Sequence, residues 1–174
     1  MKNQLTYESV PELVDHIVEN HHNYIRNTIP HLLAEVYKLA INHGDLYPFM
    51  KRVFILFSQI KSVLESNMTS EENIVFPFIK VLEKNDDRYT DFKLLPLLIN
   101  QVKEEHEFTA ILMNKIRNAT NNYEIKAGYC MAMQLAIASL KSFECNLLIH
   151  IDLENNILFD GAIAMQSRLF KASA

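Results

Sequence analysis

The sequence has no tryptophan and, among its 174 residues, only three glycines, five prolines and two cysteines. So few turn-forming residues exclude an all-β chain, which needs frequent tight turns. A hydrophobic content of 49% argues against a disordered one. The cysteines, Cys130 and Cys145, form no CxxC motif, and we expect two free, mostly buried thiols in a reducing compartment. The composition therefore favours one domain over residues 1–174, built from long helices around a sizeable core.

The sequence also lacks a strong excess of either charge and any long apolar run. The net charge is −4, with acidic and basic residues interspersed, so no basic stripe for nucleic acid is present. No apolar run approaches the roughly 18 residues of a membrane span. The first residues lead into no apolar segment of the secretory type. These absences predict a cytoplasmic protein that binds neither nucleic acid nor membranes.

Apolar residues recur at helical spacing along most of the chain. We expect helices over residues 9–43, 47–82, 91–117 and 124–153, a loop at 85–87 and a short tail helix over 162–171. Ser9 and Glu12 form a capping box, Pro30 is expected to kink the first helix, and Pro77 to bend or break the second. Short connections between long helices predict an all-α, antiparallel up-down-up-down four-helix bundle over about residues 9–160.

Two segments of the chain repeat one motif. Glu71-Glu-Asn-Ile-Val-Phe and Glu154-Asn-Asn-Ile-Leu-Phe share the pattern E-x-N-I-[VL]-F. Four residues before each glutamate stand Asn67 and His150. A histidine precedes each of these positions, His22 by 45 residues and His106 by 44. Two helical hairpins related by a pseudo-twofold axis would bring the repeated positions to one level in the core.

The repeated spacing indicates a metal site. Residues at i and i+4 lie on one helix face, so His150 and Glu154 can bind the same metal cluster. Histidines and carboxylates converging in a bundle core are typical of di-iron and di-manganese sites. A single H-x-x-x-E pair is weak evidence, and His22 or Glu71 could be solvated, but matching offsets in both halves favour a site. The candidate metal ligands are His22, Asn67, Glu71, His106, His150 and Glu154.

The other histidines are weaker candidates. His43 lies 21 residues after His22, which is about 30 Å along a helix, so we expect it at a helix end instead. His16 and His31 are interpreted as surface or packing residues. His21 points about 100° away from His22, so only one of the two faces the core, and the matching offsets select His22.

Four stretches, residues 15–22, 70–77, 104–106 and above all 150–159, resemble the hemerythrin-like domain of the iron–sulfur cluster repair proteins. The likeness runs over about residues 10–162. It implies a di-iron centre held by four histidines and two bridging glutamates. It also implies a role in recovering iron–sulfur clusters after nitric oxide or oxidative damage. The implied partners are iron ions, nitric oxide or dioxygen, and damaged iron–sulfur proteins.

The chain departs from this family at one ligand. The resemblance assigns three of the family's histidines and both glutamates to this sequence, but Asn67 stands where the fourth histidine is expected. An amide oxygen is a poorer ligand for iron than imidazole, so one metal position is expected to be weak, differently ligated or empty. Glu19, one turn from His22, could help to fill it, although a solvent-facing role is favoured. Family members commonly carry a small cysteine-containing domain before the bundle, and functions that need those cysteines are not expected here.

The resemblance leaves the activity open, and the sequence does not decide whether the protein is an enzyme. One alternative is a module that binds or senses oxygen, nitric oxide or iron without turnover, because no proton-transfer group beyond the ligands is obvious. Another is a bundle with a degenerate metal site, in which Asn67 marks the loss of binding.

Overall fold

The computed structural model describes residues 9–84 and 92–172, which form four long helical segments. In the elements below, η1, η2 and η4 are π-helical turns and η3 is a 3-10 turn. The first segment joins α1 (Val10–His16), η1 (Ile17–His22) and α2 (Asn23–Asn42), and the second joins α3 (Phe49–Ser70), η2 (Glu71–Val75) and α4 (Phe76–Glu83). The third contains η3 (Phe92–Leu94) and α5 (Leu95–Ala119), and the fourth joins α6 (Met131–Leu153), η4 (Glu154–Leu158) and α7 (Phe159–Ala172).

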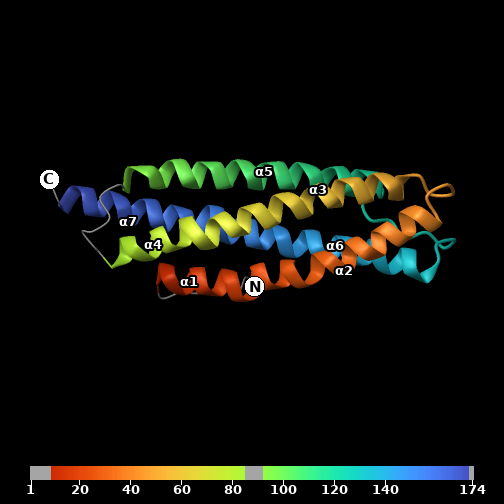
Figure 1. Ribbon diagram of the computed structural model, residues 1–174, viewed down its shortest axis with the longest axis horizontal. Coiled ribbons are helices and arrows are strands. Elements are labelled where there is room, and N and C mark those ends of the chain that lie inside the picture. Colours follow the sequence, from red (N-terminus) through yellow and green to blue (C-terminus); the bar gives the residue numbers. More distant parts are fainter. Residues whose placement is uncertain (1–8, 85–91, 173–174) are drawn as a thin grey trace.

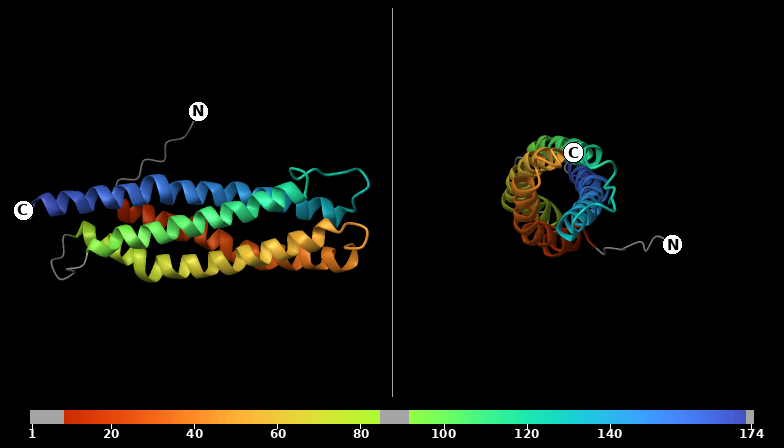
Figure 2. Two further views of the ribbon diagram at one scale, coloured as in Figure 1. Left: turned by 90° about the horizontal axis from the view of Figure 1, so that it is seen from above. Right: turned by 90° about the vertical axis from the view of Figure 1, so that its right-hand side faces the viewer.

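Successive segments run in opposite directions along one long axis (Figure 1). Seen along that axis, they surround a common centre (Figure 2). The described residues contain no β-strand. The prediction of an all-α, antiparallel four-helix bundle is therefore confirmed.

The first two segments follow the sequence signals for helix starts and breaks. Ser9 Oγ accepts a hydrogen bond from the Glu12 backbone N–H at 3.4 Å, which satisfies one of the free donors at the start of α1. Pro30 lies inside α2, and the chain stays helical through it without reversing. Pro77 lies in the first turn of α4, directly after the π-helical turn η2, so the helical segment is not broken there.

The fourth segment differs from its predicted bounds. The helix begins at Met131 instead of near residue 124, because residues 124–130 form turns and irregular backbone and Cys130 is extended just before the helix. The positive φ angles of Asn121, Asn122 and Tyr123 end helical geometry after α5. The expected tail helix is present but is the direct continuation of α6 through η4, and it starts at Phe159. The predicted loop at 85–87 and the predicted helix start at residue 91 lie outside the described residues.

Asparagine side chains accompany the three π-helical turns. A π-helical turn carries one extra residue and leaves a backbone carbonyl without its usual i+4 donor. Asn20 donates to the His16 carbonyl at 3.0 Å, and Asn73 donates to the Thr69 carbonyl at 2.8 Å. At η4, Asn156 donates to the Asp152 side chain instead. The asparagine of the repeated E-x-N-I motif thus provides a side-chain hydrogen-bond donor at the π-helical turn, where the regular backbone hydrogen bonding changes.

The apolar core consists of two clusters, one on each side of a polar level. One cluster packs residues from α2, α3, α5 and α6, including Phe57 and Phe143, whose rings meet edge to face with centroids 5.2 Å apart. The other packs residues from α1, α4, α5 and α7, including Phe76 and Phe159. In each of the four segments, a buried polar side chain interrupts the apolar sequence between the two clusters. The apolar clusters therefore fix the polar level from both ends.

Both cysteines are free, as expected, but they are exposed, and the expectation that they are mostly buried is wrong. Cys145 lies between Phe143 and Leu147, which face the core, so helical periodicity directs it outward. Cys130 precedes the first residue of α6. No helix among the described residues is long and apolar enough to span a membrane.

Candidate metal centre

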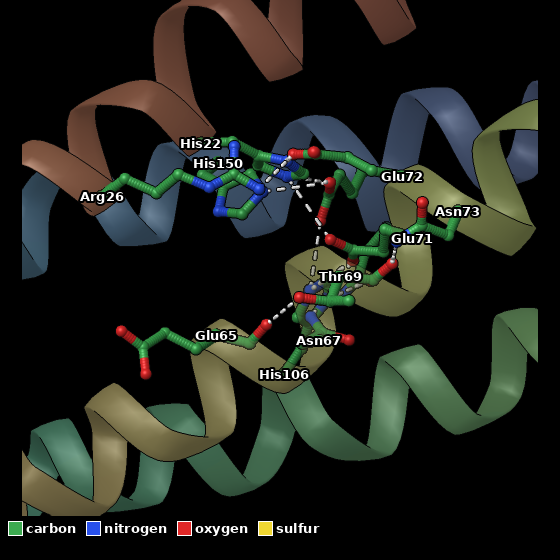
Figure 3. Close-up of polar contacts among 12 residues, drawn as sticks. His22, Arg26, Glu65, Asn67, Thr69, Glu71, Glu72, Asn73, His106 and His150 are labelled. Atoms are coloured by element: carbon green, nitrogen blue, oxygen red, sulfur yellow. Dashed lines mark hydrogen bonds and ion pairs between the residues drawn. The ribbon is translucent and has the colours of Figure 1, made fainter.

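All six candidate ligands predicted from the sequence lie at one level of the bundle and are buried. Each of the six is 0% or 1% exposed to solvent: His22, Asn67, Glu71, His106, His150 and Glu154. The histidines come from η1, α5 and α6, the amide comes from α3, and the carboxylates come from the first residues of η2 and η4. Figure 3 shows the labelled side chains of His22, Glu71, His106 and His150 pointing toward one another from different segments.

Four of these side chains form the first of two neighbouring positions. His22 Nε2 lies 3.4 Å from both Glu71 Oε2 and Glu154 Oε1. His150 Nε2 lies 3.0 Å from the same Glu154 oxygen. One ligand atom from each of the four residues falls within 4.8 Å of all the others, a spacing that suits a single metal ion. We call this the His22–His150 position.

The remaining two side chains lie on the opposite side of the glutamates. His106 Nε2 is 3.5 Å from Glu71 Oε1 and 3.1 Å from Glu154 Oε2. Asn67 Nδ2 donates a hydrogen bond of 3.1 Å to Glu71 Oε1. We call this the His106–Asn67 position. Because each glutamate directs one oxygen to each position, both are placed to act as bridging carboxylates.

The buried donor set fits a metal ion. Within the described part of the chain, eight of its atoms have no hydrogen-bond partner: His22 Nε2, Asn67 Oδ1, Glu71 Oε2, His106 Nε2, both nitrogens of His150 and both oxygens of Glu154. A buried polar atom without a partner costs about 1–3 kcal/mol, so such a cluster is not expected unless a ligand satisfies it. Imidazole nitrogens combined with carboxylate oxygens suit iron.

Two of the histidines are hydrogen-bonded at Nδ1, the ring nitrogen that faces away from the cluster. In each case the partner is the residue that follows a repeated glutamate. The Nδ1 atom of His22 lies 2.5 Å from Glu72 Oε1, which also accepts a 2.7 Å hydrogen bond from Arg26. The Nδ1 atom of His106 lies 2.9 Å from Asn155 Oδ1. Since an oxygen acceptor at Nδ1 favours the tautomer protonated there, each Nε2 is left free to face the cluster.

The sequence prediction missed both Glu72 and Asn155. Both residues occupy the variable second position of the E-x-N-I motif. That position lies beside the histidine of the same hairpin, and the repeat of the motif is the signal that could have identified them.

The charges of the cluster oppose one another. Burial disfavours the protonated form of His22, but the acceptors Glu154 and Glu71 outweigh it and raise its pKa to about 10. The same balance raises the pKa of His106 to about 10. Burial alone would raise the pKa of Glu154, but the surrounding histidines, His150 first, hold it well below its usual range. In the absence of a metal, protons therefore compensate the carboxylates, and a metal must displace them.

Of the adjacent pair His21 and His22, only His22 is fully buried, as predicted, but His21 still touches the centre. It is half-buried, and its ring stacks on that of His150 with centroids 5.7 Å apart. Burial, with the neighbouring His150 and His16, lowers the pKa of His21 to about 4. His21 and His22 both lie in the π-helical turn η1.

Three side chains considered from the sequence lie away from the cluster. His43 caps the end of α2, as predicted. His31 is exposed. Glu19 is exposed as well, so it does not complete the His106–Asn67 position, which agrees with the solvent-facing interpretation.

Comparison with known proteins agrees with this geometry. A family model described as the hemerythrin HHE cation binding domain matches residues 13–162. The chain is 29% identical over 154 residues to a probable iron-sulfur cluster repair protein of Haemophilus influenzae, and 28% identical over 153 residues to the iron-sulfur cluster repair proteins YtfE of Escherichia coli and Citrobacter koseri. Each match covers 88% of this chain and 66% of the relative, so the chain spans just under two thirds of those proteins. With 150 of its residues inside the matched region, the chain belongs to the hemerythrin HHE cation-binding family.

Proposed function

We propose that this protein is a non-haem iron protein that takes part in the repair of iron–sulfur clusters damaged by nitric oxide or oxidative stress. In this proposal its two adjacent positions bind ferrous iron through His22, His106 and His150, with Glu71 and Glu154 as bridging ligands. Asn67 completes the second position through its amide oxygen or leaves it incomplete. We also propose that it acts in the cytoplasm, where its two exposed cysteines would stay reduced.

The observation that carries this proposal is the buried set of ligand atoms without partners. Three imidazole Nε2 atoms and three carboxylate oxygens in it converge on one buried level of the core, where a bound cation can replace the protons that otherwise compensate the carboxylates. The names of the relatives support the link to cluster repair, although each relative is longer than this chain.

The chemistry that the residues can perform is binding and release of a cation. Bound iron would supply a centre able to interact with nitric oxide or dioxygen, or iron for cluster rebuilding. The protein supplies imidazoles that exchange a proton for a metal, two carboxylates that share their charge between both positions, and apolar clusters that exclude water on either side.

Iron binding is tested by anaerobic loading of the metal-free protein with ferrous iron, followed by desalting and metal analysis. The expected result is at least one iron per chain, with a rise in melting temperature of roughly 5–10 °C at a free iron concentration near 100 times Kd. A protein that retains no iron and whose melting temperature does not respond to it would support the degenerate-site alternative.

The repair role is tested with a nitric oxide-damaged iron–sulfur hydrolyase as substrate. The iron-loaded protein is expected to restore its activity faster than the same amount of free ferrous iron. The matched control is Glu154→Gln, which removes a bridging carboxylate without changing the size of the side chain. If the loaded protein binds nitric oxide, seen in its absorption spectrum, but restores no activity, the binding or sensing alternative is favoured instead.

A further inference from the structure

The contacts behind His22 and His106 are the same in geometry and different in charge. Both histidines donate from Nδ1 to an oxygen of the residue that follows the bridging glutamate of their own hairpin. For His22 that residue is Glu72, a carboxylate. For His106 it is Asn155, a neutral amide.

This difference changes the ligand strength of the two rings. An imidazole that donates Nδ1–H to a carboxylate becomes more electron-rich at Nε2 and binds a cation more strongly than one that donates to a neutral amide. Charged hydrogen bonds are also shorter and roughly twice as strong as neutral ones, in keeping with 2.5 Å for His22 and 2.9 Å for His106. Arg26 donates to the same Glu72 oxygen and thereby fixes the carboxylate that orients His22.

The side chains that face the metal positions directly also favour the His22–His150 position. The His22–His150 position has two imidazoles, whereas the His106–Asn67 position has one imidazole and an amide. The Asn67 amide nitrogen is also bonded to Glu71 Oε1, the oxygen that faces the weaker position. A cation there must either turn the amide around or share that oxygen with an N–H donor.

We propose that Glu72 is a positioning residue for His22 and that it combines with Asn67 to make the two metal positions unequal. The His22–His150 position retains its ion, and the His106–Asn67 position holds a second ion that is readily released. This inference rests on the proposed iron binding and refines it, because it identifies which of two ions is available for transfer to another protein.

The test is an anaerobic titration of metal-free protein with Co²⁺ as an optical probe, repeated with Fe²⁺ and metal analysis. The natural chain is expected to show two phases, the first at least ten times tighter than the second. Glu72→Gln keeps the shape and the acceptor oxygen but removes the charge. It should weaken the first phase by roughly 10–100-fold, alter the Co²⁺ spectrum of that phase and leave the second phase unchanged.

The reciprocal variant is Asn155→Asp, which gives His106 the carboxylate that His22 already has. It should strengthen the second phase by a comparable factor, a gain that misfolding cannot produce. Glu19→Gln is the charge-matched control, because this exposed carboxylate lies on the same π-helical turn as His22, and it should titrate as the natural chain does.

The proposal is overturned if Glu72→Gln binds both ions with natural affinities, or if it weakens both phases equally. It is also overturned if the natural chain binds two ions in a single phase. Each of these outcomes leaves the proposed iron binding intact. A natural chain that binds no metal overturns both proposals, and far-ultraviolet circular dichroism of the metal-free variants identifies any that fail to fold.

Discussion

The two hairpins of this bundle share a framework but differ in the atoms they present to the centre. In each one, a π-helical turn begins at a buried glutamate, Glu71 in η2 and Glu154 in η4. One turn earlier along the helix stands Asn67 in the first hairpin and His150 in the second. The residue after each glutamate is hydrogen-bonded to a histidine of the same hairpin. It is Glu72 in the first hairpin and Asn155 in the second.

Backbone geometry differs between the hairpins as well. The first-hairpin histidine, His22, ends a π-helical turn, whereas its counterpart His106 lies within the regular helix α5. In the π-helical turn of the first hairpin, His21 stacks on the ring of His150, which belongs to the second hairpin. A duplicated scaffold can therefore keep its shared carboxylates while each half adjusts its own imidazole and the support behind it.

The largest effect is expected where the halves depend on each other. Glu154 directs one oxygen to each position, so Glu154→Gln should weaken binding at both by at least ~100-fold, beyond the range typical of residues that only support a ligand. Anaerobic Fe²⁺ stoichiometry measures this. The control Glu107→Gln removes an exposed carboxylate next to His106 and should bind as the natural chain does. Loss at only one position would contradict the bridging arrangement.

A smaller effect is expected when the inner ligands are made equal. Asn67→His gives the first hairpin the imidazole that the second has in His150, and should tighten the weaker phase at least tenfold, with stoichiometry rising toward two. The opposite change, His150→Asn, should weaken the first phase. If Asn67→His leaves the stoichiometry unchanged, either another group already fills that position or Asn67 does not face the second ion.

The features that both hairpins share could be predicted from the sequence better than those in which they differ. The helices and all six buried residues followed from apolar periodicity and from the repeated motif, because both depend on spacing alone. Glu72 and Asn155 were missed because a polar residue beside another polar residue on a helix is usually solvated. The π-helical turns were missed too, since one extra residue in a turn leaves no distinct apolar pattern.

The pH dependence should reveal a property that the halves have in common. His22 and His106 both have pKa values raised to about 10 in the folded protein, against 6.5 when unfolded. Their contribution to stability is therefore complete below pH 6.5 and is lost as the pH rises through about 10. The metal-free protein should lose roughly 5 °C or more in melting temperature between pH 6.5 and 9.

The metal-loaded protein should behave in the opposite way. Metal and protons compete for the same nitrogens, so the stabilisation by Co²⁺ should grow as the pH rises from 6 to 8.5. Thermal melts of both forms across this range measure the two trends. His22→Asn and His106→Asn should each remove part of the alkaline loss in the metal-free protein. A loss that persists in full in the double variant would assign it to other groups.

The smallest effect is expected at Arg26, a side chain that only the first hairpin has. Arg26 lies four residues after His22, and the equivalent position after His106 is Ala110. Arg26→Ala removes a donor that orders Glu72, which weakens the first phase, but it also removes a positive charge near a cation, which tightens it. The Arg26 side chain is 40% exposed, so water screens its charge, and the loss of ordering should prevail by about two- to fivefold. Because the effect passes through Glu72, adding Arg26→Ala to Glu72→Gln should change the titration no further. If the two substitutions weaken binding independently, Arg26 acts on the metal position by another route.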